Sequence, residues 1–292
     1  MDDKPLAPGL YLVATPIGNL EDITLRALRV LRQVDRIACE DTRQTQKLLH
    51  HFGIERPTVS YHLHNEAGRG EELVAQLKDG ARIAVVSDAG TPGIADPGAP
   101  LVSAALAAGV TVYPIPGANA ALSALIASGL PAETFTFHGF LPSKAGQRRS
   151  ALEAVPRDGA THIFYESPHR ILESLADLAA VFSSEQPVVL ARELTKLHEE
   201  FLRGTVAELQ ATLGARAELA GHLRGEMVLL LTPVAHSDST SAQPGIAQAV
   251  QALIAAEGLS EKDALKRVAR ERGIGKSDAY REFQRGQSRG RR

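Results

Sequence analysis

The 292-residue chain has one cysteine, two methionines and no tryptophan, and aromatic residues make up only 4% of it. A lone Cys39 cannot form an internal disulfide, which excludes the small folds that disulfides hold together. The pairs His50-His51 and His62-Leu63-His64 lack partner ligands at zinc-site spacing, so we expect no metal. The few aromatic residues also argue against a surface on which nucleic-acid bases stack.

Long apolar runs are absent as well. The longest, near residues 102–112, is too short and too rich in alanine to span a bilayer. The start, Met1-Asp2-Asp3-Lys4, lacks the basic and apolar regions of a signal peptide, so we expect a cytoplasmic protein with no membrane partner. Neither G-x-G-x-x-G nor a Walker A sequence occurs, which argues against dinucleotide-binding and P-loop proteins.

The net charge of −2 is unevenly distributed. Residues 245–292 hold 11 Lys and Arg against 6 Asp and Glu, a net charge of +5, which leaves −7 on the first 244 residues. A basic segment on an acidic body indicates a polyanionic partner. This segment also predicts three amphipathic helices, at 246–257, 260–270 and 276–283, arranged like a helix-turn-helix. Packing or dimer contacts are the alternative role for these helices.

Three apolar strands are predicted to end in loops rich in Gly and Pro. They are residues 9–14 before the loop 15–20, residues 82–86 before the loop 87–98, and residues 110–113 before the loop 114–120. Because Gly and Pro pre-set backbone angles, such loops can hold main-chain groups close to a ligand. Ligands of open α/β sheets bind beyond the carboxyl ends of strands, so we expect the site there. An ordinary strand-to-helix turn is the alternative for the loop 87–98.

The alternation of strand, loop and helix predicts an α/β fold, with a mainly parallel first sheet covered by helices on both faces. A second α/β unit begins near Pro131, and charged residues close its strands, as in the stretches 166–170 and 192–196. We divide the chain into a first α/β domain with the Gly/Pro loops over 1–117, a second over 118–235, a linker over 236–244 and the basic segment over 245–292.

Several separate motifs agree in order and spacing with the tetrapyrrole methylase superfamily, the class III S-adenosylmethionine (SAM) methyltransferases. T-P-I-G-N-L-E-D begins at Thr15, E-D-T-R at Glu40, S-D-A-G-T-P at Ser87 and Y-E-S-P-H-R at Tyr165. The resemblance runs from about residue 9 to residue 231. Within this superfamily, the residues of these four motifs are similar to those of one bacterial branch. That branch methylates a cytidine ribose 2′-hydroxyl of 16S rRNA, in the decoding region of the small ribosomal subunit.

This resemblance implies two α/β domains with SAM in the cleft between them, and a homodimer. The residue after Asp88 is Ala89, where the corrin and sirohaem enzymes have proline, so their details are not carried over. The motifs match family regions that contact the cofactor at Pro16, Asp88, Ala89, Gly90, Ile94, Ala95, Gly117, Ala118 and Met227.

A ribose 2′-hydroxyl is a poor nucleophile at neutral pH, so a group should accept its proton. Position alone leaves four side chains open, each of which could equally cap a helix or pair with an arginine: Glu166, Glu193, Asp41 and His169. Lys196 or Arg43 could instead hold a phosphate or stabilise negative charge on the ribose oxygen. We take Glu166, Glu193 and Lys196 as the catalytic candidates.

Cations around the cleft would bind RNA phosphates without reading the sequence. We expect Lys144, Arg148 and Arg149 to be exposed on a helix that begins near Leu141. The RNA-binding candidates are Arg43, Lys144, Arg148, Arg149, Arg170 and Arg192. The acceptor could be naked 16S rRNA or the assembled small subunit.

Two other functional hypotheses stay open. One is a methyltransferase of the same superfamily that acts on a tetrapyrrole or another small molecule, which explains the loops but not the basic segment. The other is a DNA-binding regulator in which an α/β body senses a ligand and residues 245–292 bind DNA.

Overall fold

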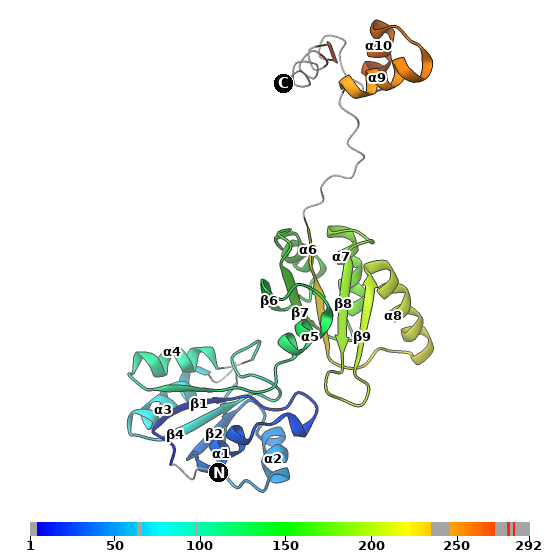
Figure 1. Ribbon diagram of the computed structural model, residues 1–292. Coiled ribbons are helices and arrows are strands. Elements are labelled where there is room, and N and C mark those ends of the chain that lie inside the picture. The colour runs from blue at the N-terminus through cyan, green and yellow to red at the C-terminus, as the bar shows by residue number, and fades with distance from the viewer. Residues whose placement is uncertain are drawn as a thin grey trace. The chain divides into compact units, whose positions relative to one another are not determined.

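The computed structural model describes residues 5–62, 66–96, 98–234, 246–271, 279, 280 and 283. The chain divides into two compact units, Met1–Val234 and Ala235–Arg292. The first unit contains two five-stranded sheets with helices packed on them (Figure 1). The expected α/β class is therefore confirmed.

The first sheet has the strand order β3-β2-β4-β1-β5, and all of its pairings are parallel, as predicted. Each carboxyl end therefore lies at the same edge of the sheet. Its strands are β1 Gly9–Val13, β2 Arg36–Cys39, β3 Thr58–Ser60, β4 Arg82–Val86 and β5 Val112–Ile115. Its helices are η1 Leu20–Asp22, α1 Leu25–Gln33, α2 Thr42–His51, α3 Glu66–Lys78 and α4 Ala99–Ala107.

Helices cover both faces of this sheet, as the apolar sequence of β1 requires. Tyr11 and Val13 point to the face covered by α1 and α2. Leu10 points to the other face, where it packs with residues of α3 and α4 such as Leu73 and Leu101. Successive side chains of a strand alternate between faces, so an apolar strand requires cover on both sides.

The second sheet is mixed. Its order is β6-β7-β10-β8-β9. The neighbouring strands β6 and β7 pair in parallel, and the other three pairings are antiparallel. The antiparallel strand β10 lies between β7 and β8, and β8 joins β9 through the short connection 193–199. The strands are β6 Phe135–Phe140, β7 Thr161–Glu166, β8 Pro187–Arg192, β9 Glu200–Thr205 and β10 Met227–Leu231.

The two faces of the second sheet are covered differently. One packs against α6 (Ala145–Glu153), α7 (Ile171–Val181) and α8 (Val206–Ala220). The other packs against α5 (Ala120–Ser128) and against Ile17 from the loop after β1. Ile17 is 8% exposed, so this apolar cluster joins the loops of the first sheet to the second sheet.

In the second unit, α9 (Ile246–Glu257) and α10 (Glu261–Glu271) pack through a small apolar core that includes Val250 and Val268. The linker expected at 236–244 lies outside the described residues, as does most of the third helix expected at 276–283. Among the described residues, no helix combines the length and apolar character needed to cross a membrane.

Candidate active site

Loops at the carboxyl edge of the first sheet are bonded to one another. The main chains of Thr15 and Gly90, which follow β1 and β4, exchange two hydrogen bonds of 2.8 and 3.0 Å. The Thr91 hydroxyl donates to the Ala118 carbonyl, after β5, at 3.1 Å. The side-chain amide of Asn119 donates to the Thr91 oxygen at 3.3 Å. Three Gly/Pro loops thus form one connected rim.

Two glycines allow the loops to come this close. Gly90 has a φ of +81°, in the region that L side chains rarely adopt. A Cβ on Gly117 would lie 2.8 Å from the Cβ of Ala14, closer than such atoms pack. Ala95 also has a positive φ of +60°, and it lines the site. Backbone held in such conformations is typical of ligand-binding loops.

A cavity of about 390 Å³ opens between this rim and residues of the second sheet. This volume lies within the range of about 300–1,000 Å³ that small-molecule sites have. The lining residues are Ile17, Asp88, Ala89, Gly90, Thr91, Ile94, Ala95, Asp96, Asn119, Ala120, Phe140, Tyr165, Glu166, Ser167, Pro168, Leu194, Glu226, Met227 and Val228.

One side of the cavity is acidic. Asp88 and Asp96 line it, and Glu40 lies close enough to affect the proton affinity of Asp96. Burial, followed by the charges of Glu40 and Asp88, raises the pKa of Asp96 to about 6, although a hydrogen bond from Ser87 acts in the opposite direction. The Asp88 carboxylate also accepts from the main-chain N–H of Asp41 at 3.0 Å. Such a wall favours a cationic ligand.

The opposite side is apolar and aromatic. Leu194, Met227 and Val228 belong to the second sheet or its loops and are buried. The rings of Phe140 and Tyr165 meet edge to face at 5.5 Å, and burial raises the pKa of the Tyr165 hydroxyl. A flat, apolar group of a ligand would fit this side.

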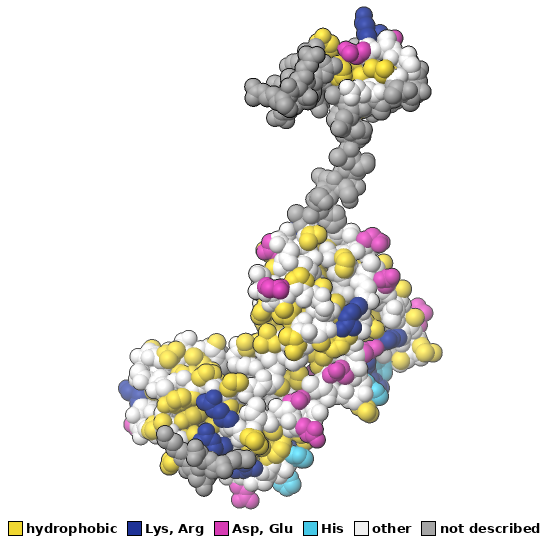
Figure 2. Space-filling model, viewed as in Figure 1, with side chains coloured by type: hydrophobic (Ala, Val, Ile, Leu, Met, Phe, Trp, Pro, Cys, Tyr) yellow, Lys and Arg dark blue, Asp and Glu magenta, His cyan; other side chains and the backbone are white. Residues whose placement is uncertain are grey.

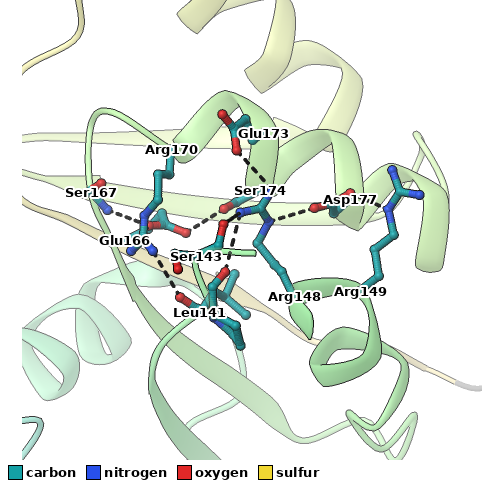
Figure 3. A network of polar contacts seen from close by, with 11 residues as sticks. Leu141, Ser143, Arg148, Arg149, Glu166, Ser167, Arg170, Glu173, Ser174 and Asp177 are labelled. Carbon is teal, nitrogen blue, oxygen red and sulfur yellow. Dashed lines mark hydrogen bonds and ion pairs between the residues drawn. The ribbon is translucent and has the colours of Figure 1, made fainter. Parts of the chain in front are cut away.

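Glu166, the first catalytic candidate, lines the cavity, but its carboxylate is fully buried and bonded (Figure 3). One oxygen accepts from the main-chain N–H of Ser167 at 2.8 Å and from Arg170 at 2.9 Å. The other accepts from the Ser174 hydroxyl at 2.5 Å. These bonds fix the end of β7 where it meets the cavity.

Glu193 and Lys196 lie beside the cavity but do not line it. The Lys196 ammonium lies 2.9 Å from Glu193 and 3.1 Å from Glu226, which does line it. Burial alone would lower the pKa of Lys196, but its two carboxylate partners outweigh this and raise it. Lys196 therefore keeps its positive charge. Glu193 and Thr195 have positive φ values of 51° and 66°, which marks this turn as strained.

The cofactor candidates divide into two groups. Pro16, Gly117 and Ala118 do not line the cavity. Pro16 directly precedes Ile17, and Ala118 directly precedes Asn119, both of which line it. Gly117 has no Cβ, and this lets the loop after β5 lie close to Ala14 in the rim. Six of the nine candidates line the cavity: Asp88, Ala89, Gly90, Ile94, Ala95 and Met227.

None of the RNA-binding candidates lines this cavity. Lys144, Arg43 and Arg149 are exposed, and the last two pair with Asp41 and Asp177. Arg170 pairs with Glu166, and Arg192 pairs with Glu200 at 2.9 Å.

Arg148 corrects the sequence-based expectation, because its side chain is only 2% exposed. Its Nε lies 2.7 Å from the buried Asp177 carboxylate, and it donates to the carbonyls of Pro142 and Ser143 at 3.5 and 3.1 Å (Figure 3). A buried cation with these partners is not available to an RNA phosphate. Its place in the fold indicates that it supports the turn after β6.

The cavity is also lined by residues that are not candidates from the sequence, among them Ile17, Tyr165, Leu194 and Glu226. Ile17 and Tyr165 stand within the quoted motifs, so motif membership is a usable signal for them. Leu194 and Glu226 reach the cavity through the packing of the second sheet, which no local pattern shows. Within the described part of the chain, no three His, Cys, Asp or Glu residues are grouped so that they could hold a metal ion.

Comparison with known proteins agrees with this architecture. The model of the family "Tetrapyrrole (Corrin/Porphyrin) Methylases" matches residues 9–210. A protein of Halalkalibacterium halodurans named "Ribosomal RNA small subunit methyltransferase I" is 49% identical over 96% of this chain and 94% of its own length. Proteins of the same name from Synechocystis sp. and Haemophilus influenzae are 45% and 47% identical, each over 93% of this chain and 95% and 94% of their own lengths.

Two solved structures share the fold at low sequence identity. A uroporphyrin-III-C-methyltransferase from Thermus thermophilus aligns with a TM-score of 0.54 and 24% identity over 77% of this chain and 94% of its own. A diphthine synthase aligns with a TM-score of 0.56 and 16% identity over 77% of this chain and 89% of its own. With a family model that covers more than half of the chain and relatives near 50% identity, this chain belongs to the tetrapyrrole (corrin/porphyrin) methylases.

Proposed function

We propose that this protein is a cytoplasmic, SAM-dependent methyltransferase that modifies the 2′-hydroxyl of a cytidine ribose in the decoding region of 16S rRNA. The observation that carries the methyltransferase part is the acidic and apolar cavity beside the connected Gly/Pro rim. Support for the RNA acceptor comes from relatives of 43–51% identity that are named for methylation of small-subunit rRNA.

SAM is the methyl donor in this family, and the cavity suits its chemistry. SAM carries a positive sulfonium and an ammonium, which Asp88 and Asp96 would attract. Its adenine is flat and weakly polar, and Leu194, Met227 and Val228 would hold it. Main-chain groups of the rim, fixed by Gly90 and its partner Thr15, would orient it.

The cofactor supplies the reactive methyl carbon, so the protein has to align the acceptor oxygen with it. Holding two reactants in line can lower a barrier by about 7–11 kcal/mol. The rim and the fixed end of β7 at Glu166 provide two rigid walls for this purpose. Lys196 keeps its charge beside Glu226 and would stabilise negative charge that develops on the ribose oxygen.

Of the catalytic candidates, Glu193 and Lys196 form an ion pair at the edge of the cavity. The Glu166 carboxylate is buried and already bonded to Arg170. Burial would raise the pKa of Glu193, but its bonds to Lys196 and to the Glu226 main chain outweigh this and lower it. A carboxylate with a lowered pKa is a weak base. We therefore propose that Glu193 serves mainly to place Lys196, and that Glu166 shapes the wall.

A homodimer is also part of this proposal. Hydrophobic side chains gather over α5 and β6 (Figure 2). Ile126 is 81% exposed and Leu122 is 47% exposed, both on α5, while Phe135 and Phe140 on the edge strand β6 are 42% and 55% exposed. Exposed groups of this kind are typical of protein interfaces. A monomeric mass at micromolar concentration in light scattering would exclude the dimer.

Transfer of radiolabel from methyl-labelled SAM tests the function. Parallel reactions would offer small ribosomal subunits, naked 16S rRNA and a precorrin-type tetrapyrrole. We expect label in one of the RNA acceptors, whereas label in the tetrapyrrole alone would favour a small-molecule methylase. Removal of residues 245–292 should leave SAM binding intact and methylation weaker but measurable. A DNA-binding regulator would lose its function altogether in the same deletion.

A further inference from the structure

A second cavity in the first unit is lined by cationic side chains. It measures about 410 Å³ and lies between the end of β8, α8 and the segment that leads to β10. Three arginines, Arg192, Arg216 and Arg224, line it together with His222 and apolar residues that include Leu213.

The positive charge of this basic cavity exceeds its negative charge. Arg192 and Arg216 both donate to the same Glu200 oxygen, at 2.9 and 2.6 Å. Burial would raise the pKa of Glu200, but these two bonds outweigh it and lower the pKa, so Glu200 stays ionised. Two of the three arginines therefore share one carboxylate, and the third, Arg224, has no carboxylate partner among the described residues.

The guanidinium groups are held in place yet keep free donors. The Nε of Arg192 donates to the Arg224 carbonyl at 2.7 Å, and the Nε of Arg224 donates to the His222 ring at 2.6 Å. Each guanidinium carries five N–H groups, and the bonds described here use only some of them. Fixed arginines with remaining donors match the oxygens of a phosphate better than flexible lysines do.

The two cavities lie on either side of one short segment. Arg224 lines the basic cavity, Glu226 lines the first cavity, and Gly225 joins them with a φ of +96°. Two Cα–Cα steps of about 3.8 Å separate Arg224 from Glu226. A phosphate in the basic cavity would thus lie near an acceptor ribose at the first one.

We propose that this basic cavity binds a backbone phosphate of the acceptor RNA close to the methylated nucleotide. This inference rests on the proposed function. Arg192, an RNA-binding candidate from the sequence, enters the site together with Arg216 and Arg224, which no sequence motif marks. The phosphate contact supplies affinity and register and does not read the bases.

The test compares Arg216→Gln/Arg224→Gln with Arg157→Gln. Arg157 is an exposed arginine that bonds to the Val181 carbonyl and lines neither cavity, so its variant loses one positive charge elsewhere, against two in the double variant. Glu200 keeps Arg192 as its partner in the double variant. Binding of a single-stranded 16S rRNA fragment would be measured at salt concentrations from about 50 to about 200 mM, where phosphate neutralisation strongly affects affinity.

We expect the double variant to bind RNA about tenfold more weakly, with a log–log salt slope reduced by about 0.7 for each phosphate that the protein no longer neutralises. SAM affinity should stay unchanged, and Arg157→Gln should match the wild type in slope. A double variant with the wild-type slope, or one whose SAM affinity falls as much as its RNA affinity, would overturn the inference.

A second measurement separates this inference from the proposed function. In this measurement, wild-type protein is titrated with inorganic phosphate while NMR records the Nε–H signals of its arginines. The signals of Arg216 and Arg224 are identified by their absence from the spectrum of the double variant. We expect these signals to shift as phosphate is added. If the wild type binds no ribosomal RNA but these signals shift, the proposed acceptor is wrong and the anion site stands. If the signals do not respond to phosphate, the anion site is wrong.

Discussion

The Nε of Arg148 lies 2.7 Å from a carboxylate oxygen of Asp177, and the two side chains are 2% and 3% exposed. This buried pair joins α6 to α7, and Arg148 also holds the carbonyls of Pro142 and Ser143. Because Phe140, just before this turn, lines the first cavity, the pair supports one wall of the site.

Removal of Arg148 should therefore destabilise the fold. In Arg148→Ala the Asp177 carboxylate would stay buried with one partner fewer, and loss of one member of a buried pair costs about 3–5 kcal/mol. Arg149→Ala is the matched control, since Arg149 bonds to the same carboxylate but is 57% exposed. Its free energy of unfolding should fall by less than about 1 kcal/mol. Urea unfolding measures both, and equal losses would contradict the supporting role of Arg148.

Asp88 should contribute to SAM affinity through its charge and through its bond to Asp41. Asp88→Ala removes both contributions, and we expect a Kd about tenfold higher, equivalent to about 1.4 kcal/mol. Asp88→Asn keeps an acceptor oxygen and should lose less. Asp79→Ala, at an exposed position beyond α3, is the control for lost negative charge. Calorimetry that returns the wild-type Kd for Asp88→Ala would rule out this role.

SAM affinity should rise with pH through about 6. The Asp96 carboxyl has a pKa of about 6, and a cationic ligand favours its ionised form, so binding releases a proton below that pH. Asp96→Asn should bind with little pH dependence over the same interval. Calorimetry in two buffers of different ionisation enthalpy counts the proton, and an unaltered pH profile in the variant would contradict the assignment.

The same shift affects the stability of the free protein with the opposite sign. A carboxyl whose pKa is higher in the folded state than its ordinary 3.8 stabilises folding fully below that value, and the contribution is lost as pH rises through about 6. Asp96→Asn should thus reduce the loss of stability between acidic and neutral pH. Melting temperatures at a series of pH values measure this.

Gly117 should not tolerate a side chain. Its Cβ would lie 2.8 Å from the Cβ of Ala14, so Gly117→Ala has to push apart two loops of the rim. We expect a loss of about 1–3 kcal/mol in stability and a weaker SAM affinity. Gly214→Ala is the control, because Gly214 lies within α8 with open space around it and should gain about 0.5–1 kcal/mol. Chemical unfolding and SAM titration of the pair test the prediction.

The rim can be predicted from sequence because its signals are local. An apolar strand such as Arg82–Val86, followed by several Gly and Pro residues, is a pattern within one stretch of chain. Its position at a carboxyl edge then follows from the parallel topology. The short strand Thr58–Ser60 and the helix Glu66–Lys78 escape prediction. The strand has only three residues, and Gly68 and Gly70 weaken the helical pattern.

The second wall depends on contacts between distant parts of the chain. Leu194 and Glu226 reach the cavity because β8 and β10 pair, and they are 32 positions apart in the sequence. An arginine such as Arg148 is usually exposed, and its burial here depends on an ion pair with Asp177, which lies 29 positions away in the sequence. Local periodicity holds no information about such partners.

The proposed function requires the first cavity to present SAM to a ribose of small-subunit RNA. The most direct measurement is incubation of small subunits with methyl-labelled SAM, followed by digestion of the RNA and identification of the labelled nucleoside. We predict that the label is recovered as 2′-O-methylcytidine from the decoding region, and that Asp88→Ala lowers its yield. Label on a base, or no label in any RNA while a tetrapyrrole is methylated, would contradict the account.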